Sequence, residues 1–166
     1  MVEPSEIDPR YEFFVTICLR GHGRAEEALE ILQKRLALEP DNHRARSLMA
    51  QTLRQLARHA EALQEARALT LADAQSSDFH ALYASLLFDA GDFKAALAEG
   101  QTAIRLEPDH RNEYCFVGNV YRRMGDLAAA ISNYEKALAL YGSGDAETVL
   151  GEMYEETGRL GDAIEA

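Results

Sequence analysis

The side chains of this chain that are best suited to chemistry are five histidines and two cysteines. No two histidines have the HExxH spacing of a zinc peptidase, and no CxxC pair could begin a structural zinc site. The segments Gly21–Gly23 and Gly142–Gly144 lack the rest of a phosphate-binding fingerprint. Adjacent Glu155 and Glu156 would not face each other on a helix, so they do not make a carboxylate pair. We therefore expect no enzyme, no metal site and no cofactor within these residues.

Arginine is the remaining side chain with a specific binding chemistry. It supplies all of the basic side chains except Lys34, Lys94 and Lys136. A planar guanidinium binds a carboxylate through two parallel N–H bonds, which a lysine cannot do. The composition therefore favours a partner that carries carboxylates, provided that the fold gathers some of these arginines on one face.

The acidic charge is concentrated at the two ends of the chain. The formal net charge is -11, but residues 1–9 hold three acids and no Lys or Arg, and residues 145–166 hold seven acids and one arginine. Between these segments there are 18 acids and 16 bases. We interpret the acids mainly as solvated surface. Because no basic face is indicated, we do not expect nucleic-acid binding.

The sequence also bears on the compartment. Met1–Arg10 is acidic and polar, the reverse of a signal peptide, and no stretch has the apolar length that spans a bilayer. Cys18 and Cys115 are far apart in the sequence and make no close pair. We therefore expect a cytoplasmic protein with no membrane segment.

The elements that must position the arginines recur every 34 residues, in blocks that begin at Pro9, His43, Ser77 and Arg111. We number the positions of each block from its first residue and refer to them as slots. Slot 20 is alanine in every block, slot 8 is small and slot 11 is large. Apolar residues return at three and four positions, which is helical spacing. Each block therefore predicts two packed helices.

Breaks in the pattern mark the ends of these helices. Gly23, Gly91 and Gly125 stand at slot 15, where a helix can end in a residue with positive φ. Asp92 and Asp126 follow two of these glycines and are expected to cap the next helix. Prolines at slot 32 of the first and third blocks (Pro40 and Pro108) are expected to end the second helix.

Residues 114–140 (YCFVGNVYRRMGDLAAAISNYEKALAL) resemble the tetratricopeptide repeat family. The residues that match the family signature there are Tyr114, Val117, Gly118, Tyr121, Ala130, Tyr134 and Ala137. The resemblance implies an all-α, right-handed superhelical solenoid of antiparallel helix pairs. It predicts a short extension at residues 1–8, repeats at 9–42, 43–76, 77–110 and 111–143, and a partial repeat at 144–166. Departures from the pattern include Glu12 at slot 4, Arg35 at slot 27 and Ala57 in place of a glycine.

The end of the chain interrupts a repeat. The partial repeat stops at slot 23 and leaves Leu160, Ala163 and Ile164 on an unfinished face. Stacks of this kind usually end in a polar capping element. We therefore expect further repeats or another domain to follow in the natural protein.

The resemblance also implies a concave groove lined by the first helix of each repeat. Carrying over the groove slots predicts these peptide-binding residues: Phe13, Ile17, Arg44, Gln51, Arg54, Phe88, Asn119, Arg122 and Arg123. Arginines in these slots favour a ligand with carboxylates; the alternative is that they pair with acids of the neighbouring repeat. The carboxylate clamp of the co-chaperone members is absent, so binding to the acidic tails of chaperones is not expected.

The first predicted helix raises a separate question, because the run from Tyr11 to Leu19 is apolar on nearly every side. A helix of that kind is normally buried on every side. Three interpretations remain open. Residues 1–8 could cover it, two copies could associate through it, or Phe13 and Ile17 could contact a ligand.

Together these patterns predict a non-catalytic scaffold that binds an extended peptide or a partner helix in its groove. A homodimer through an exposed end repeat is a further expectation. Two alternatives are the non-catalytic repeat region of a larger transferase-type enzyme and a bacterial secretion chaperone.

Overall fold

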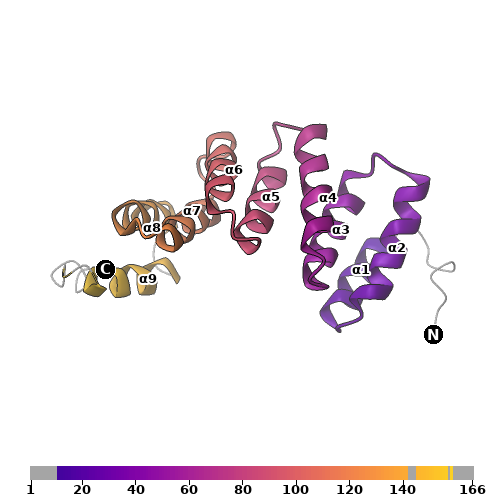
Figure 1. The fold of residues 1–166 in the computed structure, drawn as a ribbon, viewed down its shortest axis with the longest axis horizontal. Coiled ribbons are helices and arrows are strands. Elements are labelled where there is room, and N and C mark those ends of the chain that lie inside the picture. The colour runs from indigo at the N-terminus through magenta and orange to yellow at the C-terminus, as the bar shows by residue number, and fades with distance from the viewer. Residues whose placement is uncertain (1–10, 142–144, 157, 159–166) are drawn as a thin grey trace. The chain divides into compact units, whose positions relative to one another are not determined.

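A computed structural model of the chain describes residues 11–141, 145–156 and 158. All secondary structure in this described part is helical, and it comprises nine helices (Figure 1). The helices form two compact units, one within residues 1–74 and one within residues 75–166. The all-α prediction is confirmed. The predicted extension at residues 1–8, the segment Gly142–Gly144 and the end face with Leu160 lie outside the described residues.

The first unit contains two antiparallel helix pairs. Its helices are α1 (Glu12–Gly21), α2 (Ala25–Leu38), α3 (His43–Gln55) and α4 (His59–Ala72). Helix α2 packs against both α1 and α3, and α3 packs against α4. As predicted, α2 ends just before Pro40.

The second unit contains two complete pairs and one additional helix. Its helices are α5 (Ser77–Asp89), α6 (Phe93–Leu106), α7 (Arg111–Met124), α8 (Leu127–Tyr141) and α9 (Asp145–Glu156). Helix α6 packs against α5 and α7, and α8 packs against α7 and α9. The two units therefore share one packing pattern. The second helix of a repeat (α2, α6 or α8) packs against the first helix of its own repeat and against the first helix of the next repeat.

The turn between the two helices of a repeat has the same conformation in all four complete repeats. Gly23, Gly91 and Gly125 have φ values of 75°, 82° and 84°, as their position at slot 15 predicts. Ala57 takes the same conformation, with φ 57°, although its side chain disfavours it. In every repeat the N–H of slot 16 donates to the carbonyl of slot 11, at 2.9 or 3.0 Å. This is the hydrogen bond of a Schellman motif, which ends a helix at a left-handed residue.

Side-chain caps begin four of the helices. Asn42 and Ser76 accept hydrogen bonds from the backbone N–H three residues ahead, at the starts of α3 and α5. Asp92 and Asp126 do the same for α6 and α8, which confirms the prediction for both. Each such cap satisfies an N–H group that the helix itself leaves without a partner.

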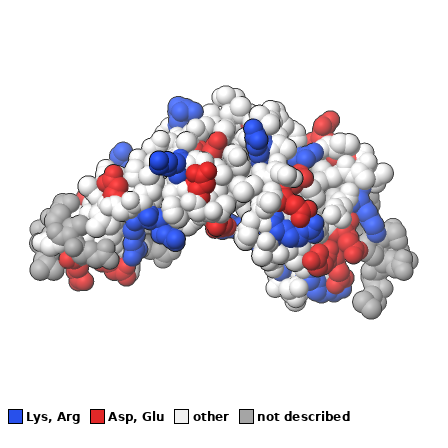
Figure 2. Space-filling model, in the orientation of Figure 1, with Lys and Arg blue, Asp and Glu red and all other residues white. Residues whose placement is uncertain are grey.

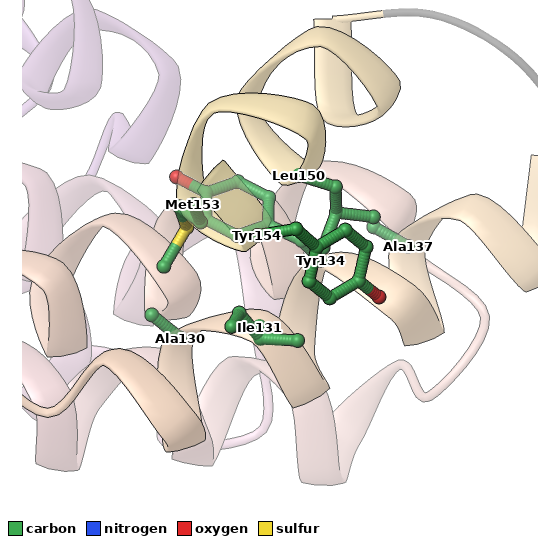
Figure 3. Close-up of a cluster of buried hydrophobic side chains, with 7 residues drawn as sticks. All are labelled: Ala130, Ile131, Tyr134, Ala137, Leu150, Met153 and Tyr154. Carbon is green, nitrogen blue, oxygen red and sulfur yellow. The ribbon is translucent and has the colours of Figure 1, made fainter. Parts of the chain in front are cut away.

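The core of each unit is built from the small and large residues that the repeat prescribes. The slot 20 residues Ala28, Ala62, Ala96 and Ala130 are all fully buried. Figure 3 shows one cluster, in which Ile131 and Tyr134 of α8 meet Leu150, Met153 and Tyr154 of α9. A Cβ added at Gly118 would lie 3.0 Å from Cε2 of Tyr134, so the glycine at slot 8 lets that ring lie close to α7.

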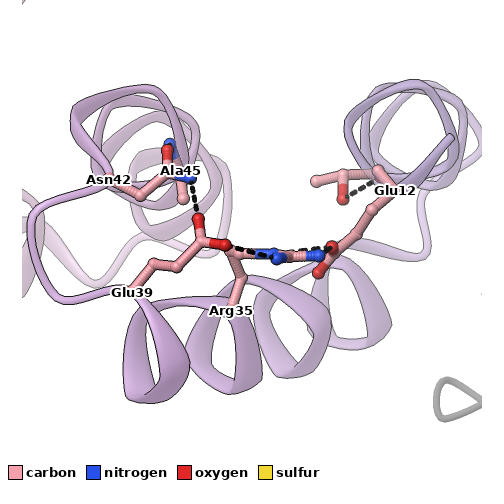
Figure 4. A network of polar contacts seen from close by, with 6 residues as sticks. Glu12, Arg35, Glu39, Asn42 and Ala45 are labelled. Carbon is pink, nitrogen blue, oxygen red and sulfur yellow. Dashed lines mark hydrogen bonds and ion pairs between the residues drawn. The ribbon is translucent and has the colours of Figure 1, made fainter. Parts of the chain in front are cut away.

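Two residues that depart from the repeat pattern lie against each other. Glu12 of α1 is only 7% exposed, and its carboxylate accepts from Nε of Arg35 of α2 at 2.8 Å and also from Nη2 (Figure 4). Nη1 of Arg35 donates to Glu39 at 2.9 Å, and Asn42, the cap of α3, donates to the other oxygen of Glu39. The departures therefore compensate for each other and connect α1 to the start of α3.

Candidate functional site

In the first unit, the first helices α1 and α3 carry five of the predicted site residues. Phe13 of α1 lies under Arg44 of α3, with the guanidinium carbon 4.6 Å from the ring centroid. This is a cation–π contact, which stabilises the position of the arginine by about 0.5–1 kcal/mol at an exposed site. Arg44 is exposed and makes no ion pair with any described residue.

The end of α1 is tied to α3 by amide side chains. Nη1 of Arg20 donates to Oε1 of Gln51 at 3.2 Å, and Nε2 of Gln55 donates to the carbonyl of Arg20 at 2.9 Å. Nε2 of Gln51 donates to Oγ of Ser47 at 3.5 Å. Burial lowers the pKa of Arg20, and its Nε is buried without a hydrogen-bond partner among the described residues. Gln51 therefore has an internal structural role at both ends of its amide.

The other two predicted residues of this unit are at the surface. Ile17 is 49% exposed, and Arg54 is exposed at the end of α3. The structure thus brings Phe13 and Arg44 into contact and places Gln51 in the network at the end of α1.

In the second unit, the predicted residues Phe88 and Arg123 belong to one aromatic cluster. The ring of Phe88 packs edge to face with Phe93 at 5.4 Å and with Phe116 at 5.9 Å between centroids. The guanidinium carbon of Arg123 lies 5.6 Å from the centroid of Phe88 and 5.2 Å from that of Phe93. Arg123 is exposed and has no ion pair with a described residue. Both units therefore hold one exposed arginine over aromatic rings.

Asn119 lies on the same first helix as Arg123. Its Oδ1 accepts a hydrogen bond from the hydroxyl of Tyr134 at 2.8 Å. Burial raises the pKa of Tyr134, so the hydroxyl stays protonated and serves as a donor. The amide nitrogen of Asn119 has no hydrogen-bond partner among the residues that the structure describes. One end of the amide is thus fixed while its donor end remains available.

The alternative that groove arginines pair with acids of the neighbouring repeat fits Arg122. Nη2 of Arg122 lies 4.0 Å from a carboxylate oxygen of Glu152 on α9, and the two side chains are 38% and 58% exposed. An exposed ion pair at this distance contributes little to stability. Arg44 and Arg123 contact rings instead.

Sequence reasoning did not include Phe93, Phe116 and Tyr134 in the site. Phe93 and Tyr134 belong to second helices, whereas only slots of first helices had been considered. Phe93 contacts Phe88 at slot 12 of its own repeat, and Tyr134 contacts Asn119 at slot 9 of its own repeat. The antiparallel packing of the two helices of a repeat is a signal that could have identified both.

Charged side chains of both signs are interspersed on the face of the molecule that Figure 2 shows. The described residues contain no group of three or more His, Cys, Asp or Glu side chains that could hold a metal ion. Among the described helices, none combines the length and the apolar character that crossing a membrane requires.

Comparison with protein families gives two matches, both described as tetratricopeptide repeat, at residues 19–86 and 118–166. The chain belongs to the tetratricopeptide repeat (TPR) family. The matches cover parts of both units. The segments that match the family in sequence are therefore also segments in which the structure has helix pairs. No protein with a curated description matches the chain in sequence.

Solved TPR structures share the fold. The crystal structure of MamA superposes with a TM-score of 0.80 at 24% identity, over 91% of this chain and 89% of that one. MamA from Desulfovibrio magneticus RS-1 gives a TM-score of 0.81 at 18% identity, over 99% and 92% of the two chains. A thermophilic TPR protein of Thermus thermophilus gives a TM-score of 0.75 at 22% identity, over 94% and 86%. These matches confirm the TPR solenoid fold, and family membership supports a general role in protein–protein interaction.

Proposed function

We propose that this TPR protein is a non-catalytic scaffold whose first helices bind an extended peptide or a partner helix that carries carboxylates. The observation that carries the proposal is that Arg44 and Arg123 each lie over an aromatic ring and pair with no described acid. Each unit thus presents one arginine that is held in position and still has hydrogen-bond donors to offer.

The contact with the ring explains how such an arginine could bind a carboxylate. A guanidinium stacks on a ring through its weakly hydrated planar face, which leaves the N–H groups along its edge available. Because the ring already restricts the side chain, less conformational entropy is lost when a ligand binds. A charge-assisted hydrogen bond formed there contributes about 1.5–3 kcal/mol.

The neighbouring residues supply the other contacts that an extended peptide needs. Phe13 and Phe88 are the apolar anchors beside the two arginines, and Ile17 adds exposed apolar surface in the first unit. Asn119 can donate its amide N–H to a carbonyl of the peptide backbone. We include Arg54, Arg122 and Gln51 as flanking polar contacts.

The proposal is tested with an arrayed library of synthetic peptides that pairs each acidic sequence with its amide counterpart, Asp to Asn and Glu to Gln. We expect the protein to retain acidic members that also carry an apolar side chain. R44Q and R123Q should each weaken binding by about tenfold or more, the effect of losing one charge-assisted bond.

Matched control variants exist on the second helices. Arg67 on α4 and Arg105 on α6 are exposed arginines without a described ion pair, and R67Q and R105Q change the net charge by the same amount. If these controls weaken binding as strongly as R44Q and R123Q, the first-helix arginines are not the site and only overall charge matters.

The proposal also includes a cytoplasmic location, which is supported by the two widely separated cysteines. A homodimer is a separate matter, since it concerns the outer face of α1.

A further inference from the structure

The outer face of α1 has the composition of a helix–helix interface. Helices α3, α7 and α9 each pack against the helix that precedes them. They use slots 3, 6, 7 and 10 for this contact. In α3, Ala45 at slot 3 and Thr52 at slot 10 are fully buried. In α7, Phe116 at slot 6 and Val117 at slot 7 lie so close to α6 that a Cβ added at Gly100 would be 3.2 Å and 3.0 Å from them. These slots therefore define the face of a first helix that receives another helix.

In the first repeat the same slots are apolar, and two of them are exposed, while Val15 at slot 7 and Cys18 at slot 10 are half-buried. Tyr11 at slot 3 is 58% exposed and Phe14 at slot 6 is 68% exposed, and Ile17 beside them is 49% exposed. Exposed apolar side chains that form a contiguous patch mark interaction surfaces more often than isolated ones do. No described helix precedes α1, so nothing in the described chain occupies the face that its slots form.

A hollow lies directly beside Phe14. It has a volume of about 290 Å³ and is lined by Phe14, Val15, Cys18, Leu19, His22 and Arg24. An apolar cavity of roughly 150 Å³ already accommodates a benzene ring. The hollow is therefore large enough for the side chain of a phenylalanine from another molecule.

The described charged side chains in and around this face are paired, although the chain carries a formal net charge of -11. Glu12, the only acid of α1, points inward and pairs with Arg35. Arg24, at the rim of the hollow, pairs with Glu27 at 2.6 Å. Among the described side chains, none would bring an unpaired like charge against its counterpart when two copies of this face meet.

We propose that two copies of this chain associate through the outer faces of their α1 helices, which run antiparallel. Phe14 of each protomer enters the hollow of the other. A two-fold interface requires a surface that is complementary to itself, and a protruding ring beside a hollow on one helix meets that requirement. The antiparallel arrangement also sets the partial positive end of each helix dipole beside the partial negative end of the other.

The size of the face predicts a weak dimer. An aromatic side chain buries roughly 150–250 Å² when it is fully covered, so the exposed parts of Tyr11 and Phe14 supply on the order of 250 Å² in each copy. With the residues around the hollow, the interface stays near or below the ~1,200 Å² at which stable complexes begin. We therefore expect a dissociation constant in the range from about 10 µM to a few hundred µM.

Sedimentation velocity of the full chain from about 5 µM to 1 mM tests this proposal. The expected result is a monomer–dimer equilibrium that F14E weakens by at least tenfold and that 0.5 M NaCl does not weaken, because the contact is apolar. L71E is the matched control, since Leu71 on α4 is 77% exposed and lies on another helix, and it should leave the equilibrium unchanged. Far-UV circular dichroism confirms that each variant is folded.

Three results would overturn the proposal. The chain could stay monomeric at 1 mM, or it could form a dimer that F14E leaves intact. Alternatively, the full chain could stay monomeric while a variant that lacks residues 1–10 forms an F14E-sensitive dimer, in which case the occupant of the face is the chain's own N-terminal segment.

Discussion

Replacing Arg35 by methionine should destabilise the first unit strongly. Methionine keeps most of the aliphatic volume of arginine and removes every donor. Glu12 would then lose the guanidinium that pairs with its carboxylate, while its side chain remains only 10% exposed. Glu39 would lose the same partner but is 51% exposed, so water can replace that contact.

The magnitude follows from the burial of the pair. Removing one partner of a fully buried ion pair costs about 3–5 kcal/mol, whereas an exposed pair contributes about 0–1 kcal/mol. Side-chain exposures of 14% for Arg35 and 10% for Glu12 place this pair nearer the buried limit. We expect R35M to lower the free energy of unfolding by about 2–3 kcal/mol, and E12Q by about 1 kcal/mol, because Arg35 then keeps Glu39.

The double variant E12M/R35M separates the ion pair from packing. It removes both charges and should lie within about 1 kcal/mol of the parent protein, because apolar residues of similar volume often replace a buried ion pair without loss. Urea unfolding followed by circular dichroism at pH 7 gives all four free energies. R24M is the control, since Arg24 is 47% exposed and its ion pair among the described residues is with Glu27, so its unfolding midpoint should not move measurably. The reasoning is refuted if R35M unfolds at the midpoint of R24M, or if the double variant is no more stable than R35M.

Three further predictions concern single sites. G151A should raise the free energy of unfolding by about 0.5–1 kcal/mol, since a Cβ there meets no described atom within 4 Å. G118A, at the same slot, should have a free energy of unfolding at least about 1 kcal/mol lower relative to its parent than G151A has, because its Cβ would press on Tyr134. Equal effects of the two variants in urea unfolding would contradict this. A57G should stabilise by about 0.5–1 kcal/mol, because glycine accepts the positive φ without strain, and a thermal melt that shifts downward would argue against it. Burial, and next the charges of Asp78 and Glu107, raise the pKa of Glu113 despite the opposing effect of His110, so the folded state binds a proton more readily than the unfolded state. Stability should therefore rise as the pH falls from above this pKa towards the ordinary value of about 4.3. E113Q removes this response and should be more stable than the parent at pH 7, and parallel stability–pH curves of parent and variant would exclude the effect.

Much of the helical framework could be predicted because it depends on local rules that repeat. Glycine at slot 15 and proline at slot 32 limit the helices, and alanine at slot 20 allows them to pack closely. The register also explains Ala57, which adopts the glycine conformation because the turn around it is fixed by the same hydrogen bonds as in the other repeats.

Pairs between helices were harder to predict, because they depend on how two side chains meet across a helix pair. Glu12 and Arg35 were each noticed as exceptions, but sequence alone did not connect them. A second example is the pairing of slots 4 and 23, where Arg46 contacts Glu65 at 2.7 Å and His80 contacts Glu99 at 2.6 Å. Two consecutive repeats each carry complementary residues 19 positions apart, so this pairing could be predicted from the sequence once the repeat register is known.

For the candidate binding residues, the sequence predicts the helix on which each one lies but not the side chains that it contacts. The repeat assigned Arg44 and Arg123 to first helices, yet it could not show that each lies over an aromatic ring, since that depends on side-chain rotamers. The partner of Asn119 was missed for the same reason, because Tyr134 reaches it from the second helix.

The central claim is that the first-helix arginines bind carboxylates of a partner peptide. The most direct measurement is a ¹H–¹⁵N NMR titration that follows the Nε–Hε signals of the arginines while the strongest acidic peptide from the library is added. The account predicts that the signals of Arg44, Arg123 or both shift and saturate, that Arg67 and Arg105 do not respond, and that the amide counterpart of the peptide has no effect. Shifts confined to Arg67 and Arg105, or equal shifts with the amide peptide, would contradict it.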